Sequence, residues 1–120
     1  VAETDDQVVG CAGLQTFATT QGQTNELIWQ DRLKRIAGCD CELHRLYVDP
    51  QARRVGAGRA LLETVLNEAR RRGCNKMEIW SDKVLEPAHR LYEKFGATNV
   101  GERLCPPPDE DPEWGMVIEL

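Results

Sequence analysis

Apolar and polar positions alternate over short distances at both ends of this chain, a pattern that predicts β-strands there. Residues 1–16 are typical of the end of one strand, a polar turn at 4–7 and a second strand, so the chain is expected to start inside a hairpin. The strand predicted at 41–48 should end at Asp49 and Pro50, because proline has no N–H to donate to a ladder. Further strands are predicted at residues 76–81, 98–104 and 114–120.

Two stretches between these strands have apolar residues at helical spacing. An apolar stripe from Leu61 to Ala69 predicts a helix that ends at Gly73. Pro87 suits the first turn of a second helix, which should end at Gly96. Strand, helix, strand, helix and strand in succession, with hairpins at both ends, predict a mixed α/β sheet.

The segment between the first hairpin and residue 41 is harder to interpret. Residues 26–37 carry Trp29, Leu33, Ile36 and Ala37 at helical spacing, and we expect a helix there. Residues 17–23 are polar and contain glycine, so they are expected to form a loop, as is the acidic segment 105–113 with its four prolines.

Length and composition indicate one small domain. A chain of 120 residues buries enough surface for a single core and too little for two. It contains no run of about 18 apolar residues and no secretory leader, so we expect no membrane contact and a cytoplasmic location.

The cysteines and the charges add two constraints. Five cysteines with a closest spacing of one residue, at Cys39 and Cys41, favour buried free thiols over a metal site, and no metal is expected. The net charge of −5 argues against a nucleic-acid partner. Residues 45–72 nevertheless hold seven arginines against three acidic residues, which suits an anionic cofactor.

The most informative segment joins the strand at 41–48 to the helix that follows. Gly56 and Gly58 have no Cβ to hold an anion away, so the peptide N–H groups of residues 55–60 are free to converge on a diphosphate at the start of a helix. A dinucleotide fingerprint would need glycine where Leu61 stands, and a triphosphate loop would need Lys-Ser/Thr after Gly58. A glycine turn needed only for tight packing is the alternative.

Arg53-x-x-Gly56-x-Gly58 resembles the [Gln/Arg]-x-x-Gly-x-[Gly/Ala] signature of the GNAT superfamily of acyl-CoA-dependent N-acetyltransferases. Residues 88–97, AHRLYEKFGA, are similar to the Ala-x-x-Leu-Tyr-x-x-x-Gly-Phe segment that this family carries on its next helix. The resemblance implies a GNAT-like fold, N-terminally truncated because the family's first strand, two helices and most of its second strand have no counterpart. It also implies acetyl-CoA as the acyl donor.

The resemblance assigns two sets of cofactor contacts. The strand residues Leu46, Tyr47 and Val48 should lie beside the pantetheine arm. The pyrophosphate should be bound by the segment from Arg53 to Ala60, mainly through main-chain N–H groups, and its members are Arg53, Arg54, Val55, Gly56, Ala57, Gly58, Arg59 and Ala60.

Two residues are candidates for proton transfer. Tyr92 is expected to protonate the leaving thiolate, although a purely structural tyrosine on an apolar helix face is the alternative. Glu42 lies eleven residues before Arg53, where some family members carry a base carboxylate, and His44 on the same strand face is the reserve. An exposed glutamate without a catalytic role is equally consistent with the sequence, and His89 is expected at the surface.

Together these features predict transfer of an acetyl group from acetyl-CoA to a small-molecule or peptide primary amine, by direct attack in a ternary complex. A non-catalytic CoA-binding or assembly module is the alternative. The missing N-terminal elements would leave a sheet edge open, which proteins rarely tolerate, so a homodimer that covers this edge is expected.

Overall fold

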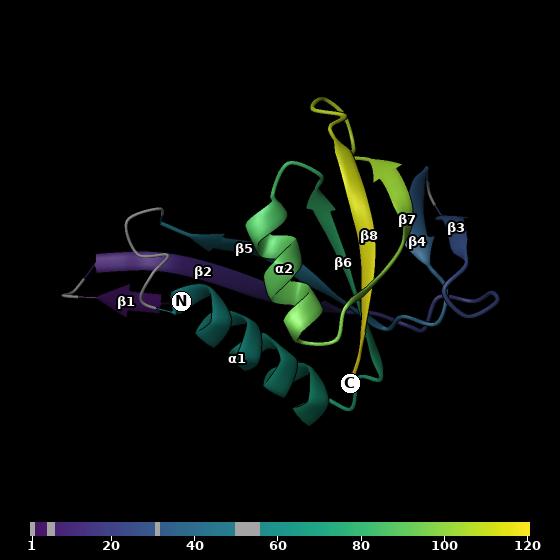
Figure 1. Cartoon of the computed structure of the whole chain (residues 1–120). Coiled ribbons are helices and arrows are strands. Elements are labelled where there is room, and N and C mark those ends of the chain that lie inside the picture. The colour runs from purple at the N-terminus through teal and green to yellow at the C-terminus, as the bar shows by residue number, and fades with distance from the viewer. Residues whose placement is uncertain (1, 5–6, 31, 50–55) are drawn as a thin grey trace.

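The computed structural model describes residues 2–4, 7–30, 32–49 and 56–120, and within them a mixed six-stranded sheet carries two helices on one face (Figure 1). Strands β5 and β6 are parallel, whereas every other neighbouring pair in this sheet is antiparallel. The strand order is β1 (Ala2–Thr4), β2 (Gln7–Thr16), β5 (Cys41–Val48), β6 (Lys76–Asp82), β8 (Pro112–Glu119) and β7 (Thr98–Leu104). The expected α/β fold class is therefore confirmed.

Helices α1 (Ala57–Arg71) and α2 (Glu86–Lys94) cover one face of the sheet and form the main core with it (Figure 1). The apolar stripe of α1 is buried as its spacing predicted, and Gly73 and Gly96 follow the two helices in left-handed conformations, with φ of 81° and 92°. Strand residues on the same face complete this core, namely Cys41, Leu43, Met77, Ile79, Met116 and Ile118. No helix in the described ranges has the length and apolar character needed to cross a bilayer.

The helix expected at residues 26–37 is wrong, because this segment forms a hairpin of β3 (Leu27–Gln30) and β4 (Leu33–Ile36). Gln30 pairs with Leu33, and Arg32 between them has a φ of 67°, which is typical of a two-residue hairpin loop. Apolar residues in two four-residue strands imitate helical spacing, since short runs do not distinguish the two structures.

The β3–β4 hairpin covers the sheet face opposite the helices. Ile36 of β4 packs with Cys39 and with Val117 of β8 in a second apolar cluster, to which Leu27, Trp80 and Val100 add partly buried contacts. The segment first interpreted as a helix therefore forms a third layer, over β6, β8 and β7.

Strands β5 and β6 separate soon after they meet. Their pairing in the described residues consists of Cys41 with Met77 and Glu42 with Glu78. Beyond Glu42, β5 runs toward β1 and β2 while β6 turns toward β8, so the sheet opens into a V (Figure 1). The wide end of this V lies beside the start of α1 (Figure 1).

Candidate active site

The β5 edge of the V offers main-chain groups to a ligand. Residues 43–48 have no β6 partner in the described part of the chain, so the N–H and C=O groups on that side are available. Against β2 the register shifts between Cys11 and Gly13, and this irregularity places an extra β5 residue between His44 and Tyr47. Leu46 and Val48 are half-buried and Tyr47 is exposed. All three predicted pantetheine residues therefore lie on the open segment.

The start of α1 stands at the wide end of the V. Gly56 precedes the helix with a φ of 77°, and a Cβ built on it would meet no atom within 4 Å. The N-cap makes no side-chain hydrogen bond, and the described first turn contains no acidic residue. Because the first N–H groups of a helix have no intrahelical partner and carry partial positive charge, this end is suited to an anion.

Gly58 joins the helix start to the strand. A Cβ built on Gly58 would lie 3.5 Å from Val48 Cγ2 and 3.6 Å from Leu91 Cδ2, so both β5 and α2 lie against this turn of α1. Ala57 is buried and Ala60 donates its N–H to the Gly56 carbonyl. Arg53, Arg54 and Val55, which were also expected at the pyrophosphate, fall in residues 50–55, outside the described part of the chain.

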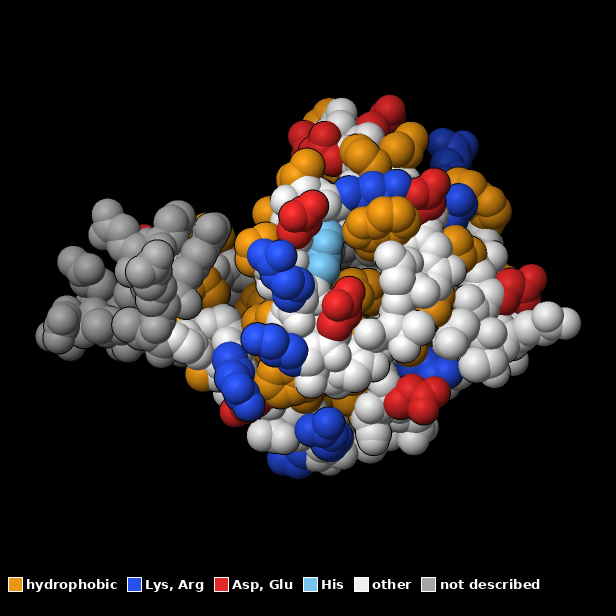
Figure 2. Space-filling model, in the orientation of Figure 1, with side chains coloured by type: hydrophobic (Ala, Val, Ile, Leu, Met, Phe, Trp, Pro, Cys, Tyr) orange, Lys and Arg blue, Asp and Glu red, His pale blue; other side chains and the backbone are white. Residues whose placement is uncertain are grey.

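Arg59 is the arginine at this end of α1 that lies within the described residues. Its side chain is 69% exposed, forms an ion pair with Glu63 at 3.1 Å, and lies 5.7 Å from the centre of the Phe95 ring. Lysine and arginine side chains are numerous over α1 and α2 on the helix-covered face (Figure 2). The basic bias read from residues 45–72 thus extends along the helix that begins at the V.

Tyr92 lies on α2 with its ring in the helix-face core, where it is 4% exposed. Burial raises the pKa of its phenol to about 12, so the hydroxyl is protonated at neutral pH. Among the described residues the hydroxyl has no hydrogen-bond partner. A protonated donor without a protein acceptor is available to a bound ligand.

Glu42 lies on the opposite face of β5, where the V begins. Its Oε2 accepts a hydrogen bond from Arg35 Nη1 at 2.5 Å, and the same nitrogen donates to Glu78 Oε1 at 2.5 Å. Glu42 is buried, at 8% exposure, so the alternative of an exposed strand glutamate is wrong. Tyr92 and Glu42 therefore lie on opposite faces of the sheet, Tyr92 in the helix-face core and Glu42 on the hairpin side.

Two members of this charged group were not anticipated from the sequence. Arg35 was placed on a predicted helix, and Glu78 was regarded only as part of a strand. Burial raises the pKa of Glu78, although hydrogen bonds from Ile36 N–H and Arg35 oppose this effect. Burial alone would lower the pKa of Arg35, but its hydrogen bonds to Glu78 and Glu42 raise it. The sequence feature that could have pointed to this group is Glu78 itself, a carboxylate on the strand predicted next to the strand of Glu42.

The two histidines differ from their expected environments. His44 Nε2 lies 3.4 Å from Glu42 Oε2, shielded from solvent and not aligned as a hydrogen bond, while 43% of the side chain is exposed. His89 was expected at the surface, but it is buried. Its Nε2 lies 3.1 Å from Ser81 Oγ on β6. His89 thus connects α2 to the sheet.

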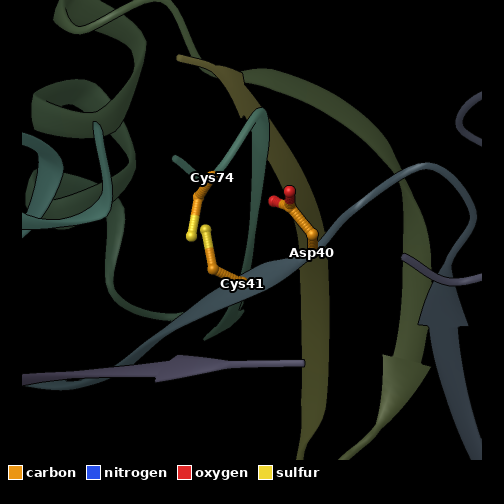
Figure 3. Close-up of side chains that lie close together, drawn as sticks. All are labelled: Asp40, Cys41 and Cys74. Atoms are coloured by element: carbon orange, nitrogen blue, oxygen red, sulfur yellow. The ribbon is translucent and has the colours of Figure 1, made fainter. Parts of the chain in front are cut away.

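A separate cluster brings together Asp40, Cys41 and Cys74 (Figure 3). One ligand-type atom from each lies within 4.8 Å of the others, and the two sulfurs point toward one another (Figure 3). Both Asp40 oxygens accept hydrogen bonds from Asn75 and Lys76 N–H groups, and burial raises the pKa of Cys41 above its usual range. The cluster therefore serves to connect β5 to the turn before β6.

The free thiols are less uniformly buried than expected. Cys39 and Cys41 are buried, Cys74 and Cys105 are partly buried, and Cys11 is exposed. The expectation of a buried thiol is wrong for Cys11, whose register partner on β5 is the exposed Tyr47.

Solved structures of other proteins have a similar fold. The ribosomal-protein-alanine N-acetyltransferase of Brucella melitensis matches with a TM-score of 0.71 at 24% identity, over 100% of this chain and 67% of its own. A GNAT-family acetyltransferase of Elizabethkingia anophelis, solved with acetyl-CoA bound, matches with a TM-score of 0.71 at 17% identity, over 98% of this chain and 72% of its own. These similarities concern the fold.

Sequence comparison supports the same grouping. An uncharacterized N-acetyltransferase of Schizosaccharomyces pombe is 37% identical over 59 residues, which are 49% of this chain and 36% of that protein. The model of the acetyltransferase (GNAT) family matches residues 1–97, most of the chain. On this match, and with the fold in agreement, the chain belongs to the GNAT family of acetyltransferases.

Proposed function

We propose that the protein transfers an acetyl group from acetyl-CoA to a primary amine. The observation that carries this proposal is the V between β5 and β6, with a glycine-started helix near its wide end. The acetyl-CoA in the Elizabethkingia structure and the acetyltransferase names of the relatives support it. The chain spans 36% of the curated relative, so the activity is a proposal for the whole protein.

Acetyl-CoA would bind along β5. The pyrophosphate would accept hydrogen bonds from the N–H groups of residues 56–59, since the Ala60 N–H already donates to the Gly56 carbonyl, and Arg59 would add positive charge. The pantetheine amides would pair with the free edge of β5 near Leu46, Tyr47 and Val48, in the manner of an added strand. Arg53, Arg54 and Val55 belong to the same proposed pyrophosphate site.

The chemistry requires proton transfer at the attacking amine and at the leaving sulfur. The acceptor ammonium loses a proton to a base on β5, for which Glu42 and His44 are the two candidates, and the amine nitrogen then attacks the thioester carbonyl carbon. When the carbon–sulfur bond breaks, the thiolate takes the hydroxyl proton of Tyr92, the nitrogen loses its second proton, and the phenolate regains a proton from solvent. A reference alkyl ammonium, with a pKa near 10.4, is neutral in only about one part in a thousand at pH 7.4, so a base is useful.

A peptide or protein amine is one acceptor class that deserves testing, because the Brucella relative is named for a ribosomal protein. The exposed acidic loop that contains Asp109 and Glu110 would attract a cationic acceptor at long range.

Two measurements test the proposal. Titration calorimetry with acetyl-CoA should show binding, and thiol release from acetyl-CoA should depend on an added amine, drawn from a panel of polyamines, amino sugars and peptides. Binding without thiol release across the panel would favour the alternative function, a non-catalytic CoA-binding module. Absence of binding would exclude both functions.

A homodimer that covers the free edge of β1 belongs to the same proposal. Strand β1 is the outermost strand on its side of the described sheet, so the main-chain groups on its outer side have no strand partner among the described residues. Sedimentation equilibrium should give twice the monomer mass, and a folded monomer would contradict this part of the proposal.

A further inference from the structure

The charged group on the hairpin side of the sheet constrains how Glu42 can act. Glu42 and Glu78 are register partners on neighbouring parallel strands, so their side chains emerge side by side. Arg35 Nη1 bridges the two carboxylates, with 2.5 Å to each. Ile36 N–H donates to the other Glu78 oxygen at 2.9 Å. Both Arg35 and Ile36 come from β4, so the hairpin supplies the contacts that hold this carboxylate pair.

An arginine hydrogen bond stabilises the ionised form of a carboxylate. Glu42 is buried, and its Oε2 already accepts a hydrogen bond from Arg35, which also holds Glu78. Glu42 is therefore engaged by its protein neighbours, which leaves an acceptor little access to its carboxylate. The base should be a neighbour of Glu42 that reaches the acceptor.

His44 has that position. Its Nε2 is shielded from solvent and lies 3.4 Å from the same Glu42 oxygen, Oε2, that binds Arg35. Because 43% of the side chain is exposed while Nε2 is not, Nδ1 is the nitrogen left for the acceptor. Contacts of this kind often align only in the complex with substrate.

We infer that His44 takes the proton of the acceptor amine and that Glu42, Arg35 and Glu78 are positioning residues that orient it. This inference rests on the proposed acetyl transfer. The ammonium N–H bond breaks, its proton forms a bond with His44 Nδ1, and the electron pair stays on the amine nitrogen that attacks the thioester. The resulting imidazolium is stabilised by Glu42 through Nε2–H, as a carboxylate stabilises histidine in hydrolase triads.

The groups that face His44 and Glu42 come from three sides. Arg35 of β4 and Glu78 of β6 carry charge, and Cys39, whose pKa burial raises to about 12, is neutral near pH 7. Across β2, Gly13 and Gln15 are the register partners of His44 and Glu42, and neither titrates. Among the described residues, these are therefore the neighbouring groups whose charge bears on the pH dependence of the base step.

The tautomer of His44 tests the inference without any turnover. Nitrogen chemical shifts of the imidazole, assigned with His44→Gln, should show the neutral ring protonated at Nε2 in the wild-type protein. Glu42→Gln should reduce this preference toward the mixture of a free imidazole. A neutral ring protonated at Nδ1, or one that does not respond to Glu42→Gln, would overturn the inference even if acetyl transfer were confirmed.

The pH dependence of kcat/KM then identifies the proton acceptor. We expect His44→Gln to abolish the acidic limb and to lower the rate by about 10²-fold. Glu42→Gln should keep the limb but lower kcat/KM, because the imidazole loses the carboxylate that orients it. If Glu42→Gln abolished the limb and His44→Gln preserved it, Glu42 would be the base and the inference would be wrong.

A matched control separates positioning from stability. Arg35→Gln should reduce kcat about tenfold and weaken the Nε2 tautomer preference, and Arg35→Lys should restore part of both. Arg103 forms a similarly buried ion pair with Glu113 on β8, at 2.9 Å, so Arg103→Gln should lower stability and leave the tautomer unchanged. An equal tautomer change in both glutamine variants would show that Arg35 acts only through stability.

Failure of the proposed function gives a different result. If acetyl-CoA binds but no amine on the panel releases thiol, the acetyl-transfer proposal fails. The histidine tautomer in Glu42→Gln and Arg35→Gln still decides whether the four residues form one oriented network.

Discussion

Tyr92 combines a packing role with a proposed chemical role in one side chain. Its ring belongs to the core between α2 and the sheet, whereas its hydroxyl has no acceptor among the described residues. Loss of the ring and loss of the hydroxyl should therefore have separable effects, and phenylalanine removes only the hydroxyl.

We expect Tyr92→Phe to lower kcat by about 10²-fold or more, because the thiolate would leave without a proton donor. The dissociation constant of acetyl-CoA should change less than about threefold, since the ring and its packing remain. Thiol-release kinetics and calorimetry measure the two effects. An unchanged kcat would remove Tyr92 from the chemistry and leave it a structural residue.

The buried phenol also predicts a pH dependence of stability. Its folded-state pKa is raised to about 12 from a reference of 10.0, so the folded protein retains the proton longer than the unfolded chain. This contribution to the free energy of unfolding is fully present below pH 10 and is lost as the pH rises toward 12.

Urea unfolding between pH 9 and 12 should therefore show a steeper decline for wild-type protein than for Tyr92→Phe. Tyr47→Phe is the control, because 56% of the Tyr47 surface is already exposed in the folded protein. Identical slopes for wild type and Tyr92→Phe would contradict the raised pKa.

The motifs in the sequence single out part of the proposed site residue by residue. Tyr92 and Glu42 followed from fixed spacings to the glycine turn, and Glu42 lies at the start of the V. Arg35 and Glu78 were missed because their contact depends on the register of two strands and the fold of an inserted hairpin. Neither property is encoded in a local motif.

At the level of elements, α1 begins at the proposed cofactor site and ends at the turn before β6. Arg59 belongs to the first turns and Arg70 to the last turn, so the helix offers two exposed arginines in opposite dipole environments. Only the first is placed to approach a diphosphate.

Arg59→Gln should weaken acetyl-CoA binding by about five- to tenfold and reduce the dependence of affinity on salt. Arg70→Gln is the matched control and should leave affinity within twofold, because it lies at the opposite end of the helix. Calorimetry at two ionic strengths measures both variants. Equal effects of the two substitutions would indicate general charge attraction in place of a defined site.

Long or strongly patterned elements were predictable from the sequence, whereas the short inserted ones were not. The strands Cys41–Val48 and Thr98–Leu104 agree with their expected bounds, and both helices end beside the expected glycines. The β3–β4 hairpin was missed because each strand has four residues, too few for alternation to outweigh an accidental helical spacing.

On the scale of the whole molecule, the sheet consists of two halves that meet through a short ladder. Strands β6, β8 and β7 are paired over most of their lengths, as are β2 and β5, but β5 and β6 share two register pairs. A mixed sheet with helices on its faces was expected from the family resemblance. The position at which they separate depends on tertiary packing that no local pattern reports.

Amide hydrogen exchange should reveal this division. Without ligand, the amides of residues 43–48 that face β6 should exchange faster than those of the β6–β8 ladder, because they lack a β partner. Saturating acetyl-CoA should slow these β5 amides and the first amides of α1 by about tenfold or more. Site-resolved NMR provides the measurement, and uniform protection in both states would contradict the proposed binding mode.

The short β5–β6 ladder has a consequence for the fate of the protein in a cell. A ligand that occupies the V replaces the hydrogen bonds of a missing strand, and at one hundred times its dissociation constant it would add about 2.7 kcal/mol to the free energy of unfolding. Scarcity of that ligand would leave the two halves joined mainly through the core beneath α1 and α2. Proteases would then remove the empty molecules first, so the abundance of the protein would follow the supply of its ligand.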